Sequence, residues 1–286
     1  NVLKSSVALA RAAGEPFDSH RIELFGKLLE HLAGKEFPEC HDENVSDDDY
    51  AMFAFFESYF SNYIEGTVFE LDEARRIAET GVAIPTRDAD SHDILGTYAI
   101  ASNRREMCRR AATADEFLDI LRSRHRVVMS GRPSCAPGLF KTRDNRAGNT
   151  HFVSFDRVRG TLKRGFDMSR SIRHPFARAV FIMFLTSEVH PFADGNGRIS
   201  RLMMNAELTA AGQTKIIVPT VFRPDYIGAL RRLSRDGDPE VIVAAMARLW
   251  EFGRWLSFGD FETMKSRLEK SGAFSDDDGV ILRFGN

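Results

Sequence analysis

Apolar residues recur at helical spacing along most of the chain. Between residues 21 and 33, one face of a helix would carry Ile22, Phe25, Leu28, Leu29 and Leu32. Comparable patterns predict helices at 47–65, 71–79, 92–107, 114–124, 158–163, 199–211, 224–234 and 239–256. No alternation of strands with helices accompanies these patterns, so the sequence predicts an all-α fold.

One predicted helix, residues 175–189, has no polar face. Its segment 180–185 is continuously apolar, which is typical of a helix at the centre of a bundle. A buried parallel strand would show the same apolar run, but the surrounding sequence lacks the strand–helix–strand alternation that a parallel sheet needs. We therefore expect a central helix that ends at His190.

Glycine and proline interrupt the helical pattern between residues 131 and 151. They predict a loop with short extended pieces, such as a hairpin. The expected organisation is an N-terminal helical region over residues 1–95, a core over residues 96–255, and a weakly patterned tail over residues 256–286.

The composition is that of an ordinary globular protein and narrows the function. The net charge of −2 gives no overall basic field, so we expect no nucleic-acid partner. We expect no membrane span either, because the sequence has no apolar run of the necessary length. The cysteines at positions 40, 108 and 135 fit neither a disulfide framework nor a zinc site, and they predict free thiols in the cytoplasm.

The residues with the clearest chemistry lie between two predicted helices, at positions 190–201. This segment reads His-Pro-Phe-Ala-Asp-Gly-Asn-Gly-Arg-Ile-Ser-Arg. Its residues Gly195, Asn196 and Gly197 stand at the start of a helix, where unpaired backbone N–H groups attract anions such as phosphate. The glycines let a phosphate approach the backbone closely, so we expect an anion site here.

Charged and titratable side chains flank this predicted anion site. Arg198 and Arg201 share one face of the following helix, and two guanidinium groups there suit a polyphosphate. Beside phosphates, Asp194 would bind Mg²⁺, and His190 would accept a proton from an attacking hydroxyl. A purely structural glycine turn is the alternative; a calcium loop fails because Arg198 stands where such a loop needs Asp or Asn.

The segment resembles the signature of the Fic family, His-x-Phe-x-(Asp/Glu)-Gly-Asn-Gly-Arg-x-x-Arg, at every fixed position. The resemblance extends to His174-Pro175, which looks like the start of the family's central helix, and to residues 138–153, which are similar to its flap. The resemblance implies a Fic-fold helical bundle with a short β-hairpin flap, in which residues 96–255 form the catalytic core.

The resemblance also implies a role for each motif residue. His190 would be the general base that activates a hydroxyl of a target protein, and Asp194 would bind Mg²⁺. The glycine loop would form the anion hole, while Arg198 holds the β-phosphate of ATP and Arg201 the γ-phosphate. The hydroxyl of a Ser, Thr or Tyr would attack the α-phosphorus, so that AMP is transferred and pyrophosphate leaves.

Two further groups of residues follow from the resemblance. The flap would dock the target protein through Asn149, Thr150, His151 and Phe152. Where the family often has Ala-Asn-x-Gly-Asp, residues 234–238 read Ser-Arg-Asp-Gly-Asp. Tyr226 and Arg235 are therefore candidates for an adenine pocket, with a core position as the equal alternative for Tyr226, and the base preference stays open.

Residues 61–66 read Ser-Asn-Tyr-Ile-Glu-Gly, which resembles the family's inhibitory motif (Ser/Thr)-x-x-x-Glu-(Gly/Asn). The resemblance implies an N-terminal inhibitory helix at about residues 47–66, in which Ser61 and Glu65 belong to the motif. Glu65 would pair with Arg201 and deny it to the γ-phosphate, because a buried arginine needs a carboxylate partner. An exposed helix glutamate is the usual explanation of so short a motif, and removal of AMP by water is a second role for Glu65.

Other functions remain open on the sequence alone. The same site could transfer UMP, phosphocholine or phosphate, or the chain could be a non-catalytic regulatory protein that binds ATP. The expected partner is a target protein or the chain itself, and a homodimer is compatible with the sequence. The sequence identifies neither the target protein nor the signal that would relieve inhibition by Glu65.

Overall fold

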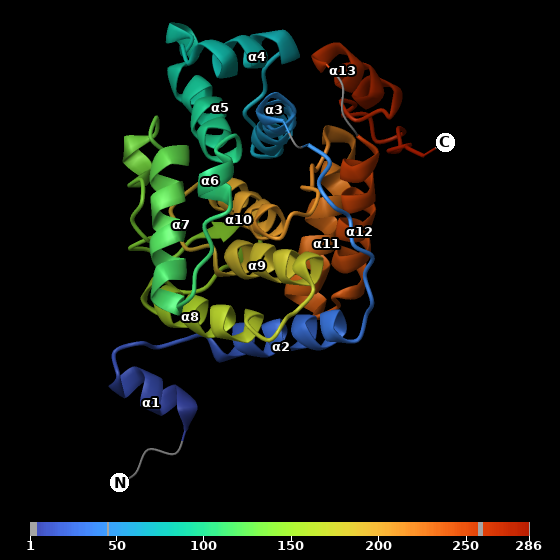
Figure 1. Cartoon of the computed structure of the whole chain (residues 1–286). Coiled ribbons are helices and arrows are strands. Elements are labelled where there is room, and N and C mark those ends of the chain that lie inside the picture. The colour runs from blue at the N-terminus through green and yellow to red at the C-terminus, as the bar shows by residue number, and fades with distance from the viewer. Residues whose placement is uncertain (1–4, 45, 257–259, 286) are drawn as a thin grey trace.

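The structure, a computed structural model, describes residues 5–44, 46–256 and 260–285, and within these residues it is a bundle of helices with one small hairpin (Figure 1). At its centre lie α9 (Pro175–Val189) and α10 (Asn196–Ala210), joined by the predicted loop. The larger helices around them are α2 (Ser19–Ala33), α3 (Asp47–Ile64), α5 (Asp88–Ala101), α7 (Ala114–Val128), α8 (Val158–Ser169), α11 (Arg223–Asp236) and α12 (Glu240–Trp255). The prediction of an all-α fold is confirmed.

The other described elements are shorter. The helices are α1 (Ser6–Ala12), α4 (Leu71–Thr80), α6 (Arg104–Met107) and α13 (Phe261–Lys270), with 3-10 turns at Pro85–Arg87, Pro133–Cys135, Phe155–Arg157 and Thr220–Phe222. The hairpin consists of β1 (Arg146–Ala147) and β2 (Thr150–His151). Among the helices described, none combines the length and the apolar character that a membrane span requires.

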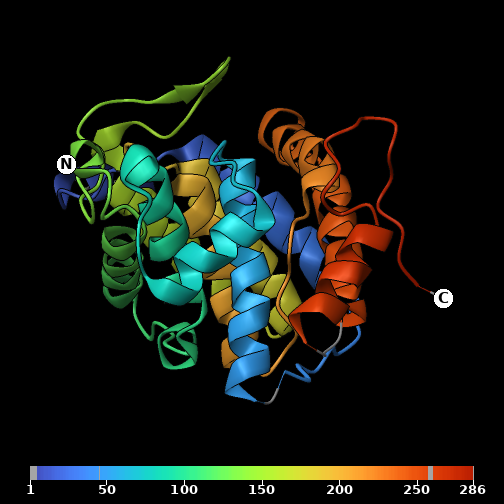
Figure 2. The ribbon, with the colours of Figure 1, turned by 90° about the horizontal axis from the view of Figure 1, so that it is seen from above.

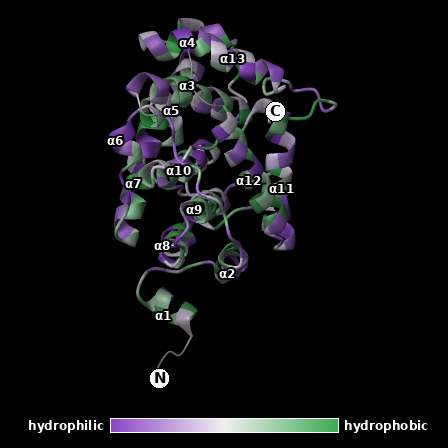
Figure 3. Cartoon of the chain, turned by 45° about the vertical axis from the view of Figure 1, so that its right-hand side comes forward, coloured by the Kyte–Doolittle hydropathy of each residue, from purple (hydrophilic) through white to green (hydrophobic). Residues whose placement is uncertain are grey.

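Helix α9 is buried on all sides, as its continuous apolar run predicts. The side chains of residues 180–185 are at most 1% exposed, whereas hydrophilic residues cover the outer sides of peripheral helices such as α4 and α7 (Figure 3). The helix begins at the cap residue His174, whose side chain accepts the N–H of Phe176, and Pro175 occupies its first turn. It ends at His190, so the predicted range matches the observed one.

Helix α3 is anchored at its start and along its length. The Ser46 hydroxyl accepts the Asp49 N–H at 3.1 Å and caps the helix. Along the helix, Phe53, Phe56 and Phe60 are buried in the hydrophobic core. This packing fixes α3 against the centre of the bundle.

The end of α3 has the geometry of a Schellman motif. The Gly66 N–H donates to the Tyr63 carbonyl at 3.0 Å, and the Thr67 N–H donates to the Asn62 carbonyl at 3.0 Å. Gly66 has φ 91°, a left-handed conformation that glycine adopts without strain. The turn therefore stops the helix and places Glu65 directly beyond its last residue.

Several predicted boundaries need correction. The helix predicted at 92–107 is divided, because α5 ends at Ala101 and the Asn103 side chain caps a separate helix, α6. The helix predicted at 158–163 continues to Ser169, and the one predicted at 199–211 already begins at Asn196. In the tail, where the sequence pattern was weak, α13 forms behind the cap residue Asp260. The division of the chain into three parts stays a prediction.

Helices α5 and α7 approach so closely at Gly96 that a side chain has no room. A Cβ at this position would lie 2.6 Å from the Val127 carbonyl oxygen and 2.8 Å from the Val128 Cα. We expect Gly96→Ala to destabilise the protein by about 1–3 kcal/mol, because backbone atoms cannot move aside as a flexible side chain can. Urea denaturation measures this loss.

The control for this prediction is Gly26→Ala. Gly26 lies inside α2, and a Cβ there would meet nothing within 4 Å. Alanine should stabilise that helix slightly. Equal denaturation midpoints for the two variants would contradict a close approach of the two helices at Gly96.

Candidate active site

The loop between α9 and α10 is shaped by Asn196. Its side-chain Oδ1 accepts the Phe192 N–H at 2.8 Å, and its Nδ2 donates to the Phe192 carbonyl at 2.9 Å. Gly195, with φ 75°, turns the chain into α10, and the first helical hydrogen bond runs from the Ile199 N–H to the Gly195 carbonyl. The N–H groups of the first turn therefore have no acceptor within the helix. Asn196 thus uses its side chain to hold the loop and has only its backbone N–H to offer an anion.

His190 ends α9 in a left-handed conformation, with φ 51° and ψ 60°. Its ring stacks on Phe152 with 3.6 Å between ring centroids, and its Nδ1 lies 3.2 Å from the Ser187 carbonyl oxygen. With the Nδ1 proton donated to that carbonyl, Nε2 carries the lone pair. Burial, assisted by the charge of Lys141, lowers the pKa of His190 to about 4. The imidazole is therefore neutral near pH 7, the state that a general base requires.

His125 contacts the loop between α9 and α10 and helps to hold it in place. The sequence did not indicate this role, because His125 belongs to no local motif. Its Nδ1 accepts the Gly138 N–H at 2.8 Å, its Nε2 lies 3.0 Å from the Asp194 carbonyl oxygen, and its ring stacks on Phe192 at 3.7 Å. Because Nδ1 is an acceptor, the proton is on Nε2 and is donated to Asp194. Burial lowers the pKa of His125 to about 4 as well. His125 thus connects α7, the loop and the segment that leads to the flap.

His125, which is buried, and His190, which is half-buried, predict a loss of stability in mild acid. Their pKa in the folded protein, about 4, lies below the ordinary 6.5, so between these values the unfolded chain binds more protons. Their stabilising contribution is present above pH 6.5 and is lost as the pH falls toward 4. We expect urea midpoints to fall from pH 7 to pH 5, with a smaller fall in His190→Gln. A midpoint that rises over this range in both proteins would contradict the burial of neutral imidazoles.

Glu65 and Arg201 form the ion pair that the inhibitory motif predicted. The Arg201 Nη2 lies 2.7 Å from the Glu65 Oε1. The same guanidinium donates from Nε to the Ser61 hydroxyl and from Nη2 to the Ser61 carbonyl, both at 2.9 Å. The Arg201 side chain is 5% exposed, so α3 and its final turn supply the partners that burial demands.

The Glu65 carboxylate also lies against the start of α10. A Cβ at Gly197 would be 2.1 Å from the Glu65 Oε1 and 3.1 Å from its Oε2. Only glycine at this position leaves room for the carboxylate. The negative group therefore stands at a helix N-terminus, where an anion is stabilised.

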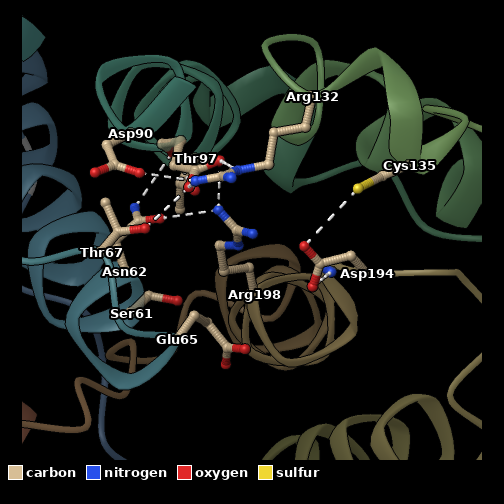
Figure 4. A network of polar contacts seen from close by, with 12 residues as sticks. Ser61, Asn62, Glu65, Thr67, Asp90, Thr97, Arg132, Cys135, Asp194 and Arg198 are labelled. Atoms are coloured by element: carbon tan, nitrogen blue, oxygen red, sulfur yellow. Dashed lines mark hydrogen bonds and ion pairs between the residues drawn. The ribbon is translucent and has the colours of Figure 1, made fainter. Parts of the chain in front are cut away.

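Arg198 points away from this carboxylate and is engaged elsewhere. Its Nη1 lies 2.7 Å from the Oδ1 of Asp93, and the two side chains are 4% and 1% exposed. Arg132 donates to the same carboxylate from Nε at 2.9 Å and from Nη2 at 2.6 Å. Figure 4 shows Arg198 and Arg132 converging, with Glu65 on the opposite side of Arg198. The contact of Arg198 with a β-phosphate stays a prediction.

Asp93 has a charge state that fits these two partners. Burial by itself would raise the pKa of the Asp93 carboxyl, but the hydrogen bonds from Arg132 and the charge of Arg198 bring it below its ordinary value. The carboxylate is therefore ionised, and it fixes the direction of Arg198. Neither Asp93 nor Arg132 belongs to a local sequence pattern, and their role follows only from the fold.

Asp194 is the exposed carboxylate of the loop. Its Oδ1 accepts the Gly195 N–H at 2.7 Å, and its Oδ2 lies 3.9 Å from the Cys135 Sγ. Within the described residues, no group of three or more His, Cys, Asp or Glu side chains is arranged to hold a metal. A single carboxylate fits Mg²⁺, which takes its other ligands from substrate phosphates and water. Asp194 therefore suits the predicted metal only together with a polyphosphate.

A cavity of about 220 Å³ lies beside the loop and gathers several predicted residues. Its lining includes Glu65, His190, Gly197, Arg201 and Tyr226. Tyr226 is also part of the core, since it is 1% exposed and its hydroxyl lies 3.5 Å from the Met183 Sδ. Tyr226 is therefore a core residue that also lines the cavity, and its contact with adenine stays a prediction.

Arg235, predicted for an adenine pocket, lies outside the lining of this cavity, so the structure does not bring it together with the other predicted site residues. Its Nη2 donates to the Thr150 hydroxyl of the flap at 3.0 Å. The preceding residue, Ser234, lines the cavity instead. Because α11 continues to Asp236, the inner face of the helix carries Ser234, and Arg235 is turned toward the hairpin.

The hairpin has the form of the predicted flap and lies at the edge of the bundle (Figure 2). Ala147 pairs with Thr150, and Gly148 and Asn149 form the turn between the strands. On its other side, the Arg21 Nη2 donates to the carbonyl of His151 at 2.7 Å. The hairpin is thus held by arginines from two helices, α2 and α11. Docking of a target by the flap stays a prediction.

Comparisons with known proteins agree with this geometry. Residues 116–208 match the Fic/DOC family. The chain is 30% identical over 245 residues to protein adenylyltransferase Fic of Drosophila melanogaster, covering 82% of this chain and 47% of that protein. It is 28% identical over 220 residues to protein adenylyltransferase fic-1 of Caenorhabditis elegans, covering 75% of this chain and 43% of that protein. The chain thus spans less than half the length of these relatives.

Solved structures show the same fold. A Fic-1 fragment from Caenorhabditis elegans superposes with a TM-score of 0.60 at 21% identity, covering 92% of this chain and 75% of that one. A Fic-domain-containing signalling protein from Bacteroides thetaiotaomicron gives a TM-score of 0.62 at 17% identity, covering 90% of this chain and 98% of that one. The signature loop, the family match and the shared fold agree, and the chain belongs to the Fic/DOC family.

Proposed function

We propose that this protein transfers AMP from ATP to a Ser, Thr or Tyr hydroxyl of a target protein and that Glu65 restrains the reaction. The observation that carries the proposal is the position of Arg201, which lines the cavity with His190 and Gly197 and is paired with Glu65. The relatives named protein adenylyltransferase support the reaction type. Because the chain covers less than half of their length, its own activity is a proposal.

The chemistry follows from the groups around the cavity. The triphosphate of ATP would lie at the start of α10, where unpaired N–H groups stabilise negative charge. The Nε2 of His190 would accept the proton of the target hydroxyl, whose oxygen forms a bond to the α-phosphorus as the bond to pyrophosphate breaks. Arg201 would hold the end of the triphosphate and fix the line of attack. Mg²⁺ bound at Asp194 would neutralise phosphate charge.

Restraint by Glu65 has two physical components. Its carboxylate neutralises Arg201 and also stands beside Gly197, at the N-terminus of α10. A phosphate in the same place would meet a negative charge and find the guanidinium already engaged. ATP that does bind would therefore place its terminal phosphate elsewhere, and the α-phosphorus would not be aligned for attack.

Labelled nucleotides test the reaction directly. The protein and its Glu65→Gly variant are incubated with Mg²⁺ and with ATP labelled at either the α- or the γ-phosphate, and the modified protein is analysed by mass spectrometry. AMP transfer predicts incorporation of the α-label without the γ-label. Incorporation of the γ-label would identify phosphate transfer instead. A protein that binds ATP in calorimetry without incorporating either label would be a regulatory protein, and the proposal would be wrong.

A further inference from the structure

The cavity continues beyond the phosphate end, along α11. The guanidinium carbon of Arg201 lies 5.9 Å from the centre of the Tyr226 ring, and Ser234 lines the same cavity eight residues further along the helix. In an α-helix this separation corresponds to about 12 Å. Phe184, Ile227 and Leu230 contribute apolar side chains to this stretch of the lining, to which Arg231 also belongs. An apolar slot of this length beside a phosphate site suits a nucleoside.

A buried carboxylate stands at the far end of this slot. Glu188 lines the cavity, and its side chain is 4% exposed. Its Oε1 accepts the Ser234 hydroxyl at 3.0 Å and forms an ion pair with the Nε of Arg21 at 2.7 Å. Both contacts use the same oxygen, and among the described residues the Oε2 has no hydrogen-bond partner.

The environment of Glu188 favours one more donor. Burial raises the pKa of the Glu188 carboxyl, and the charge of Arg21 only opposes this shift. An N–H group reaching Oε2 would stabilise the ionised form. A ligand in the slot can supply that N–H, because the carboxylate belongs to the cavity wall.

We propose that Glu188 recognises the exocyclic amino group of adenine and thereby selects ATP. An ionised carboxylate only accepts hydrogen bonds, and the amino group on C6 of adenine donates them. Hypoxanthine and guanine carry a carbonyl oxygen on C6, which would face the carboxylate as a second acceptor without a proton between them. A buried polar group left unpaired in this way disfavours the wrong ligand. The inference rests on the proposed transfer of AMP.

The test compares ATP with ITP, which differ at C6 of the base. In the Glu65→Gly background, kcat/KM is measured for both nucleotides with and without Glu188→Gln. We expect the preference for ATP to fall by about tenfold to a hundredfold, because the glutamine amide can donate to the C6 oxygen. The matched control is Glu207→Gln, which removes a buried carboxylate that pairs with Arg178 at 3.0 Å outside the cavity. This control should leave the preference unchanged.

Binding measurements separate this inference from the proposed function. Calorimetry with ADP and IDP gives the base preference without any transfer, and circular dichroism melting shows whether Glu188→Gln is folded. Should the loss of a charged partner for Arg21 unfold it, the double variant Arg21→Gln, Glu188→Gln keeps the pair neutral. If no transfer is observed but the preference for ADP over IDP is lost in Glu188→Gln, the proposed function is refuted and the role of Glu188 is retained. An unchanged preference in a folded variant would overturn the role of Glu188 and leave AMP transfer intact.

Discussion

Glu65→Gly should raise self-labelling by α-labelled ATP about tenfold to a hundredfold. The carboxylate engages Arg201 and stands against the first turn of α10, so its removal frees two groups that the triphosphate needs. A charge-assisted hydrogen bond contributes about 1.5–3 kcal/mol, and each 1.36 kcal/mol in the activation barrier changes the rate tenfold. The initial rate of label incorporation, at equal protein concentrations, measures the effect.

Two companion variants identify the cause of the increase. Glu65→Gln keeps the size of the side chain but removes its charge, and it should raise labelling by a large part of the glycine effect. Glu70→Gly changes an exposed glutamate whose side chain makes no capping bond to α4, and it should label as the unaltered protein does. Labelling that is the same with and without the Glu65 carboxylate would exclude an inhibitory role for it.

Removal of the His190 imidazole should abolish most of the transfer that Glu65→Gly releases. Loss of a general base lowers a rate by about 10²–10⁴-fold. The effect should fall on kcat, with little change in KM for ATP, because the imidazole deprotonates the acceptor and does not hold the triphosphate. Rapid-quench measurements at saturating ATP give the rate of the transfer step.

The choice of substitution matters at His190 because of its backbone. With φ 51°, the residue has a left-handed conformation that asparagine tolerates better than alanine. His190→Asn should therefore fold as the parent does, and any loss of transfer in it reports on the imidazole. A rate within about twofold of the parent would assign the proton transfer to another group.

The loop at residues 190–201 could be predicted from the sequence because its chemical groups are contiguous. Within twelve residues it has a predicted helix start, two glycines and two arginines, and this combination indicates a phosphate site without knowledge of the fold. The pairing of Glu65 with Arg201 is different, since 136 positions separate them, and only the resemblance to a family motif brought them together. The contact itself is confirmed by the structure, whereas its effect on activity awaits the measurements above.

The functional residues that could not be predicted from the sequence depend on tertiary packing. His125 and Arg132 act through partners on other helices, and a single histidine or arginine has no local pattern that would reveal this. The position of Arg235 outside the cavity lining has a geometric reason, because one residue corresponds to a rotation of about 100° around a helix axis. Ser234 therefore lines the cavity while Arg235 is turned toward the hairpin, and the residue pattern alone does not show which of the two faces inward.

The embedding of α3 in the core limits how the proposed restraint by Glu65 could be relieved. Withdrawing the helix would expose Phe53, Phe56 and Phe60, whose burial stabilises the folded protein. Glu65, by contrast, lies past the last helical turn with 26% of its side chain exposed, and it can leave Arg201 by rotation about its own side-chain bonds. Arg201 would meanwhile keep its two bonds to Ser61 and stay aimed at the cavity. If Glu65 restrains the reaction as proposed, its release depends on the populations of its side-chain rotamers, and a basic group offered to Glu65 at the surface would shift them.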